Sequence, residues 1–272
     1  MTEPRTVLLT GAAGGVATHL RERLPALGHL LRLADVRPVP DAPEALVFDL
    51  RDPDAVREAV RGVDAVVHLG GISLEDTFEH VLDANVRGTH HVYEAVREEG
   101  ICRVVLASSN HAVGFTPLPA PGGAPIGADT PQRPDTFYGL SKCFAENLAS
   151  LYADRYGIET VSLRIGSCFP APRSVRMLAT WLSPDDCARL VHAALTAPLD
   201  PPLTRHTVVH GISANTRAWW DLGPARALGY HPQDDAETFA EKVLAEHGPL
   251  DPADADARFI GGQFTGPQPP RA

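Results

Sequence analysis

The chain has 272 residues, of which 44% are apolar and 21% charged, and its 24 Lys and Arg against 34 Asp and Glu give a net charge of −10. A chain of this length and composition can bury a large core without disulfides. Nucleic acids and anionic membranes are bound through clustered positive charge, so the acidic balance argues against both as partners.

The cysteines and histidines indicate a cytoplasmic protein without a metal site. The four cysteines lie far apart and form no C-x-x-C pair, which fits neither a zinc site nor a secreted disulfide framework. The twelve histidines show no metal-ligand spacing. No stretch of the chain approaches 18 apolar residues, so we expect no membrane-spanning segment.

Short strand-like runs alternate with longer amphipathic stretches over the first 170 residues or so. The predicted strands are Thr6–Thr10, His29–Leu33, Leu46–Phe48, Ala65–Leu69, Arg103–Ala107 and Thr160–Ile165. The predicted helices are Val16–Leu27, Pro53–Arg61, Phe78–Glu99 and Thr136–Tyr156. This alternation is typical of βαβ units and predicts an α/β fold with a doubly wound parallel sheet of the Rossmann type.

The alternation weakens after Ile165. The predicted elements there are a helix over Pro184–Thr196, a strand over Thr207–Val209 and a helix over Ala236–Glu246. A Pro/Gly-rich loop, Thr116–Pro134, interrupts the first part, and the tail from Asp251 is expected to be ordered only in part. We predict a dinucleotide-binding domain over residues 1–166 and a smaller, substrate-facing region over residues 167–272, intertwined with it.

A glycine-rich turn, TGAAGGVA, follows the first strand and opens a helix. Backbone N–H groups and the positive end of a helix can hold a pyrophosphate at such a turn. The expected cofactor contacts in the turn are Gly11, Ala13, Gly14, Gly15 and Val16. Taken alone, the same glycines would also fit an ordinary turn between strand and helix.

Asp35 supports a dinucleotide, because it ends the second strand where a carboxylate can accept hydrogen bonds from an adenosine ribose. An acidic residue there favours NAD over NADP, although Arg32 and Arg37 nearby keep this preference from being absolute. Further cofactor contacts are expected after the third and fourth strands, at Asp49, Leu50, Leu69, Gly70 and Gly71.

Tyr138 and Lys142 lie four positions apart, a spacing that puts both side chains on one face of a helix. An ammonium near a phenol stabilises the phenolate and lowers its pKa, which makes tyrosine a usable base. The chain has only one other lysine, Lys242, so we interpret the pair as a proton-transfer site. Ser109, at the end of the fifth strand, can bond a substrate oxygen, while its neighbour Ser108 is expected to point away.

Together these residues resemble the extended branch of the short-chain dehydrogenase/reductase superfamily, over at least residues 6–166. The resemblance rests on the TGAAGGVA turn, Asp35, NVRGT from Asn85, Ser108-Ser109 and the Tyr138/Lys142 pair. It implies hydride transfer at a nicotinamide, Tyr138 as acid/base, Lys142 also on the nicotinamide ribose, and Ser109 positioning the reacting oxygen. Asn85 and Cys168 are also expected to contact the cofactor.

Further stretches are similar to uronate dehydrogenases, which oxidise the anomeric carbon of a hexuronic acid with NAD. These stretches are HLGGIS, ASSNHAVG, YGLSKCFAENLA, RIGSCFPAP, RMLATWLSPDD, SANTRAWWD and RFIGGQF. A hexuronate carboxylate needs a cation in this acidic chain, and of Arg173 and Arg176 the second matches the family position. The residues expected to bond the sugar hydroxyls are Ser73, Ser109, Asn110, His111 and Ser167, although His111 would also fit a structural role.

The implied reaction is oxidation of D-glucuronate or D-galacturonate at C1 to the aldarolactone, with Tyr138 as base and hydride passing to NAD. One alternative is a nucleotide-sugar epimerase, dehydratase or reductase, which the short C-terminal part disfavours. The other is a non-catalytic NAD sensor, which has no need of Tyr138, Lys142 and Ser109. The resemblance also implies a homo-oligomer packed through the Phe78–Glu99 and Thr136–Tyr156 helices.

Overall fold

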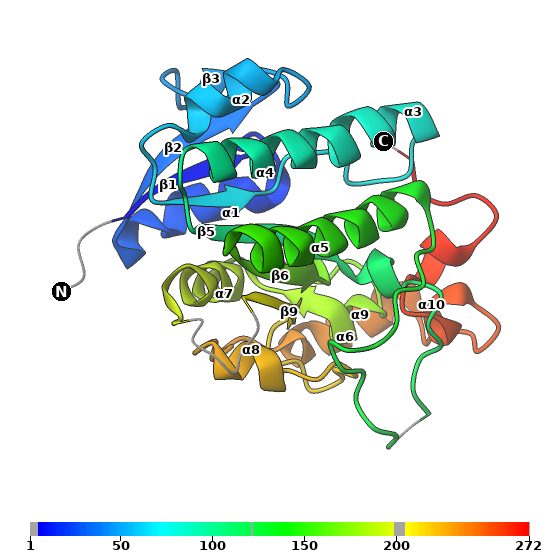
Figure 1. Cartoon of the computed structure of the whole chain (residues 1–272). Helices are drawn as coiled ribbons and strands as arrows, with labels where there is room; N and C mark the ends of the chain where they lie inside the picture. The colour runs from blue at the N-terminus through cyan, green and yellow to red at the C-terminus, as the bar shows by residue number, and fades with distance from the viewer. Residues whose placement is uncertain (1–4, 121, 199–204, 272) are drawn as a thin grey trace.

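The computed structural model describes residues 5–120, 122–198 and 205–271 (Figure 1). Within these ranges, seven parallel strands form one sheet in the order β3-β2-β1-β4-β5-β6-β9. They are β1 (Arg5–Thr10), β2 (His29–Asp35), β3 (Leu46–Val47), β4 (Ala65–His68), β5 (Arg103–Ser109), β6 (Glu159–Ile165) and β9 (His206–Gly211). The predicted doubly wound parallel sheet is confirmed.

Helices cover both faces of the sheet, as Figure 1 shows. One face carries α1 (Gly15–Arg23), α7 (Pro184–Thr196) and α8 (Gly223–Ala227), and the other carries α2 (Pro53–Val60), α4 (Gly88–Glu98) and α5 (Phe137–Tyr156). Alternate strand residues serve the two cores: Val7 and Leu9 pack on the first face and Leu8 on the second. A sheet buried on both faces explains the continuous apolar runs of its strands.

Shorter elements complete the fold. They are η1 (Pro25–Leu27), α3 (Phe78–Val81), η2 (Leu82–Arg87), η3 (Asn110–Val113), β7 (Ser167–Cys168), α6 (Met177–Thr180), β8 (Trp181–Leu182), η4 (Ala236–Phe239), α9 (Ala240–His247), α10 (Ala255–Arg258) and η5 (Gly262–Thr265). All but η1, which precedes β2, come after the carboxyl end of a strand. The helix predicted over Val16–Leu27 ends at Arg23, because Pro25 cannot continue it and begins η1 instead.

The helix predicted over Phe78–Glu99 is interrupted by a π-helical turn, η2. Asn85 lies in this turn, accepts a hydrogen bond from the backbone N–H of Ile72 (2.7 Å) and donates to the Ile72 carbonyl (2.9 Å). It also donates to Ser141 Oγ on α5 (2.9 Å). A π turn inserts one extra residue, which a regular helical period does not reveal. The interruption thus lets Asn85 tie the loop after β4 to α5.

The part of the chain after residue 166 contributes to the main sheet as well as to the small elements. β9 pairs with β6 along six residues, from Thr160↔His206 to Ile165↔Gly211. The division at residue 166 stays a prediction. The tail from Asp251 differs from the expectation of partial order: over residues 251–271 it forms α10 and η5 and buries Ile260 completely.

The Thr116–Pro134 loop contains no helix or strand at its described residues, as predicted, but it is held at several points. The N–H of Leu118 bonds the Arg258 carbonyl of the tail (2.9 Å), and that of Ile126 bonds the Trp219 carbonyl (2.8 Å). The guanidinium of Arg164 donates to the Ala128 carbonyl (3.2 Å). Segments distant in the sequence therefore fix this loop beside the end of the sheet.

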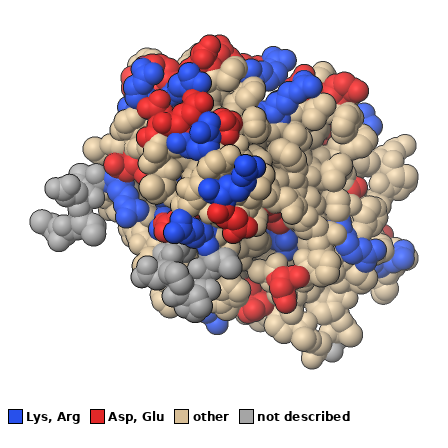
Figure 2. Space-filling view, in the orientation of Figure 1, with Lys and Arg blue, Asp and Glu red and all other residues tan. Residues whose placement is uncertain are grey.

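On the face that Figure 2 shows, Lys and Arg side chains are interspersed with Asp and Glu side chains. This mixing gives this face none of the continuous positive field by which nucleic acids are held. Among the described residues, no helix is long and apolar enough to cross a membrane.

A buried ion pair joins α5 to β6. Glu146 and Arg164 are 3% and 4% exposed, and the guanidinium donates to both carboxylate oxygens at 2.9 and 2.8 Å. Burial alone would raise the pKa of Glu146, but the hydrogen bonds and charge of Arg164 overcome this and hold that pKa below its ordinary value. Ser108 Oγ also donates to Glu146 (2.6 Å), so its hydroxyl is used by this ion pair, although Ser108 is among the residues that line the cavity described below.

We predict that Glu146→Gln lowers the free energy of unfolding by about 3 to 5 kcal/mol, because it leaves the buried Arg164 charge without its counter-ion. Urea denaturation measures the change. Glu58→Gln is the control: its ion pair with Arg61 is solvent-exposed, and its loss should barely move the midpoint. Equal midpoints for the two variants would contradict the prediction.

Candidate active site

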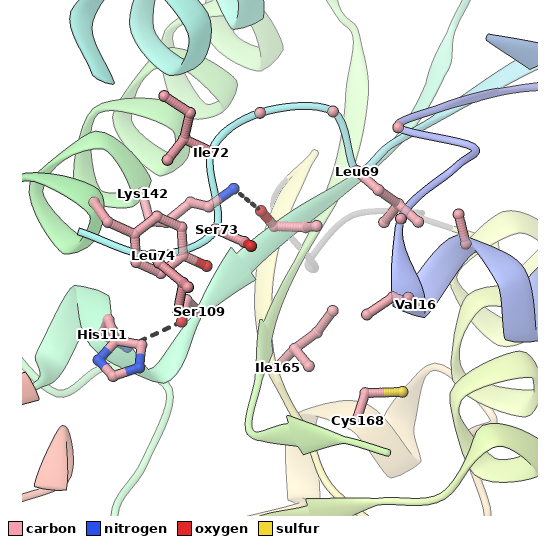
Figure 3. Close-up of a pocket in the computed structure, with 18 of the residues that line it drawn as sticks. Val16, Leu69, Ile72, Ser73, Leu74, Ser109, His111, Lys142, Ile165 and Cys168 are labelled. Atoms are coloured by element: carbon pink, nitrogen blue, oxygen red, sulfur yellow. Dashed lines mark hydrogen bonds between the residues drawn. The ribbon is translucent and has the colours of Figure 1, made fainter. Parts of the chain in front are cut away.

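A cavity of about 1120 Å³ opens at the carboxyl ends of the strands. Among its lining residues are the predicted Gly11, Gly14, Gly15, Val16, Asp35, Asp49, Leu50, Leu69, Gly70, Gly71, Ser73, Ser109, Asn110, His111, Tyr138, Lys142, Ser167, Cys168 and Arg176. In Figure 3, Lys142, Ser73 and Ser109 lie on one side of this cavity, and Val16, Ile165 and Cys168 on the other. Two predicted residues, Ala13 and Asn85, do not line it.

The glycine turn packs closely against the loop that follows β4. Gly11 has φ +71°, and a Cβ there would lie 2.7 Å from the Gly70 nitrogen and 2.8 Å from the Leu69 carbonyl carbon. A side chain at this position would therefore force the two backbones apart. No side chain caps α1, so the first N–H groups of that helix remain available to an anion such as a pyrophosphate.

Asp35 lines the cavity at the end of β2 and is 9% exposed. Its carboxylate accepts hydrogen bonds from the N–H groups of Ala13 (2.9 Å) and Arg37 (2.9 Å). Ala13 thus orients the carboxylate while itself lying outside the cavity lining. The Arg37 Nε lies 3.8 Å from the same carboxylate, with its side chain 70% exposed. An acid fixed in this way suits the two hydroxyls of an adenosine ribose.

Tyr138 and Lys142 lie on the first two turns of α5, a helix capped by the hydroxyl of Thr136. Lys142 Nζ donates to the Ala107 carbonyl of β5 (2.8 Å) and lies 5.5 Å from the centre of the Tyr138 ring. The two side chains therefore share one helix face, as the spacing predicts.

Burial controls the protonation of this pair. It raises the pKa of Tyr138 to about 12, against the opposing effect of a hydrogen bond with Ser109. It lowers the pKa of Lys142 to about 8, partly offset by the charge of Glu146. The expected lowering of the tyrosine pKa by Lys142 is not seen, because the ammonium is directed at the Ala107 carbonyl.

His68, the last residue of β4, is 2% exposed and is a part of the site that no local sequence pattern predicts. Its ring nitrogens bond Thr10 Oγ1 (2.7 Å) and Thr89 Oγ1 (3.1 Å), and Thr10 Oγ1 also accepts from the Gly70 N–H (3.2 Å). Burial, followed by the charge of Lys142, lowers the pKa of His68 to about 3, so it stays neutral. It therefore braces the Gly70 backbone without adding charge.

Arg176 lines the cavity between the end of β5 and the tail. Its guanidinium donates to the Ile260 carbonyl and, in the amide orientation that satisfies both neighbours, to the Asn110 Oδ1 (2.9 Å). Asn110 in turn donates to the Ile165 carbonyl (3.0 Å). Arg176 Nε is buried without a hydrogen-bond partner among the described residues. Burial lowers the pKa of Arg176, opposed by the negative charges of Asp256 and Asp135.

The tail supplies lining residues that the sequence did not predict. They are Asp256, Gly261, Gln263, Phe264 and Pro270. The Phe264 ring stacks on His111 with centres 4.0 Å apart. The stretch RFIGGQF, noted in the family resemblance, was the available signal. The irregular composition of the tail predicts only partial order. In the structure, however, the Glu75 N–H donates to the Pro270 carbonyl (3.0 Å) and holds the end of the tail in place.

The chain is similar to known proteins over most of its length. Residues 7–182 match the NAD dependent epimerase/dehydratase family. A uronate dehydrogenase of Pseudomonas syringae pv. tomato is 49% identical over 269 residues, which cover 97% of this chain and 94% of the relative.

Two solved structures match at similar coverage. A mutant uronate dehydrogenase from Agrobacterium tumefaciens complexed with NAD has a TM-score of 0.87 and 45% identity, covering 96% of this chain and 97% of that one. A glucuronic acid dehydrogenase from Chromohalobacter salexigens has a TM-score of 0.88 and 44% identity, covering 96% of each chain. By its sequence, its fold and these similarities, the chain belongs to the NAD dependent epimerase/dehydratase family.

Proposed function

We propose that the protein oxidises a free hexuronic acid at C1 and passes the hydride to NAD. The observation that carries this proposal is the content of one cavity: it is lined by Tyr138, Lys142 and Ser109 and also by the cation Arg176, which is held beside Asn110 and Ile260. The similarity to uronate and glucuronic acid dehydrogenases supports the same substrate class.

The cavity lining suits NAD. Gly11, Gly14 and Gly15 would bring backbone N–H groups to the pyrophosphate, and Asp35 would bond the adenosine ribose. The residues proposed to complete the contacts are Val16, Asp49, Leu50, Leu69, Gly70, Gly71, Tyr138, Lys142 and Cys168. Ala13 and Asn85, which were expected among them, lie outside the cavity lining and act on it through Asp35 and through the loop after β4. When bound, the cofactor supplies the hydride acceptor.

Tyr138 is the proposed general base. As the C1–H bond breaks and the hydride leaves, the Tyr138 phenolate oxygen takes the proton of the C1 hydroxyl, so that C1 becomes a carbonyl carbon and a pyranose becomes the aldarolactone. Ser109, which lines the cavity with Tyr138, would hold the reacting oxygen. The Lys142 ammonium, 5.5 Å from the centre of the Tyr138 ring, would turn from the Ala107 carbonyl to stabilise the phenolate and to bond the nicotinamide ribose.

Arg176 is the proposed partner of the substrate carboxylate. Its guanidinium is held by Asn110 and the Ile260 carbonyl, and Arg176 is among the residues that line the cavity, where a guanidinium can pair with a carboxylate. The side chains proposed to bond the sugar hydroxyls are Ser73, Ser109, Asn110, His111 and Ser167. Both D-glucuronate and D-galacturonate fit this scheme, since each carries the carboxylate and the C1 hydroxyl that it requires.

The tail favours a free sugar acid over a nucleotide sugar. Gln263, Phe264 and Pro270 line the cavity and so take up space around it. A nucleoside diphosphate would need further residues to bind it, whereas the short part of the chain after β6 already supplies these lining residues. A sensor without catalysis is disfavoured because it would not need a base beside an oxygen-positioning serine.

A cytoplasmic location is part of the proposal. All four cysteines are free thiols. Free thiols are typical of a reducing compartment.

We propose a homo-oligomer that packs through α3 and α5. Phe78, Phe137, Leu140 and Leu151 are 43 to 48% exposed there, and Figure 2 shows few charged atoms over the N-terminal half of α5. Light scattering should give a multiple of the mass of one chain, and Leu140→Glu with Leu151→Glu should reduce it to one. A single-chain mass for the unchanged protein would refute this.

We predict that Tyr138→Phe lowers kcat for uronate oxidation by about 10² to 10⁴, because the variant has no phenolate oxygen to accept the proton. The Kd for NAD, measured by calorimetry, should remain nearly unchanged. Tyr156→Phe is the matched control, since Tyr156 lies on the same helix and outside the cavity lining. Full turnover by the Tyr138 variant would eliminate the mechanism.

We predict that Arg176→Ala raises KM for uronates by roughly ten- to a hundredfold, because charge-assisted hydrogen bonds to the carboxylate are lost. KM for the corresponding neutral aldoses should change little. Arg173→Ala is the control, because Arg173 is exposed and stacks on the Phe169 ring (3.8 Å). An equal loss for acids and aldoses would assign Arg176 another role.

A further inference from the structure

His111 is clamped on several sides at the substrate end of the cavity. Its ring stacks on Phe264 (4.0 Å between centres) and lies 5.8 Å from the Tyr138 ring. Its Nδ1 lies 2.7 Å from Asp135 Oδ2. The second ring nitrogen, Nε2, has no hydrogen-bond partner among the described residues and is not buried, and the side chain lines the cavity. Figure 3 places His111 next to Ser109. The open nitrogen is therefore the one available to a ligand.

The Asp135 carboxylate is fully enclosed, with its side chain 0% exposed against 12% for His111. Oδ1 accepts a hydrogen bond from Thr136 Oγ1 (2.9 Å), and Oδ2 faces the His111 ring. An ionised carboxylate can only accept, so the proton of this contact sits on His111 Nδ1. A neutral ring protonated at Nδ1 presents Nε2 as an acceptor.

Three glycines from separate segments make room for this carboxylate. A Cβ on Gly114 would lie 1.9 Å from Asp135 Oδ2, one on Gly261 would lie 2.0 Å from it, and one on Gly139 would lie 3.0 Å from Oδ1. Gly114 follows η3, Gly261 lies in the tail, and Gly139 lies in the first turn of α5. Each segment thus has a glycine where any side chain would collide with or crowd Asp135.

We propose that Asp135 is a positioning residue for uronate oxidation, which rests on the proposed function. It holds the His111 ring with Nδ1 protonated, so that Nε2 accepts a hydrogen bond from a hydroxyl of the sugar. Asp135 does not touch the substrate and acts only through His111. The pair therefore sets how the sugar is oriented while Tyr138 removes the proton at C1.

The test is Asp135→Asn. The amide can donate to Nδ1, which moves the ring proton to Nε2 and turns the acceptor that faces the sugar into a donor. We expect KM for D-glucuronate and D-galacturonate to rise about tenfold, with the Kd for NAD unchanged. ¹⁵N NMR of labelled histidine should show Nδ1 changing from the protonated to the unprotonated type.

A double-mutant cycle separates positioning from a general effect on folding. If Asp135 acts through His111, adding Asp135→Asn to His111→Ala should leave KM where His111→Ala alone puts it. Asp186→Asn is the control: Asp186 is equally buried and bonds the N–H groups of Gln233 and Asp234 outside the cavity. It should lower Tm without moving KM.

An unchanged KM in Asp135→Asn, or an undiminished further rise on top of His111→Ala, would overturn the proposal. Failure of the proposed function has a different signature, because the unaltered protein would then not oxidise uronates at all. In that event the NMR measurement still decides whether Asp135 sets the protonated nitrogen of His111.

Discussion

The contacts between successive turns of α5 and the end of β5 fix the geometry of the whole site. Tyr138, Lys142 and Glu146 are four residues apart and form one row along the helix. Tyr138 lines the cavity with Ser109, Lys142 bonds the Ala107 carbonyl, and Glu146 bonds Ser108 and the buried Arg164. Burying these polar groups would be costly without such partners, so the contacts allow one register of the helix against the strand. That register presents the tyrosine oxygen to the cavity.

The substrate side of the cavity depends on segments that are irregular in sequence. The tail brings Phe264 onto His111 and the Ile260 carbonyl onto Arg176, and its backbone pairs with the Thr116–Pro134 loop. The loop is anchored in turn by the Arg164 guanidinium, which also serves Glu146. The ion pair under α5 thus connects the proton-transfer side to the sugar-binding side, and the two halves of the site are built as one packed unit.

Local patterns were enough to predict most of the residues that meet at the glycine-turn side of the cavity. Each of these signals, the Gly11 turn, Asp35 and the Tyr138/Lys142 spacing, is contained in a few consecutive residues. The apolar runs of the buried strands predict the parallel sheet in the same way. The π turn at Asn85, the bracing by His68 and the enclosure of Asp135 could not be predicted, because each depends on contacts between distant segments. The expectation that the tail is only partly ordered is wrong for the same reason. Its Pro, Gly and Asp residues indicate no regular element, but hydrogen bonds to distant segments order it.

Oxidation of a free uronate is the central claim, and the most direct measurement is NADH absorbance with purified protein, NAD and one sugar at a time. D-glucuronate, D-galacturonate, D-glucose and UDP-glucose separate the alternatives, because they differ in the carboxylate and in the nucleotide. The account predicts rapid NADH formation with the two free uronates and far slower formation with the other two. Turnover of UDP-glucose alone, or no turnover of either uronate, would contradict it.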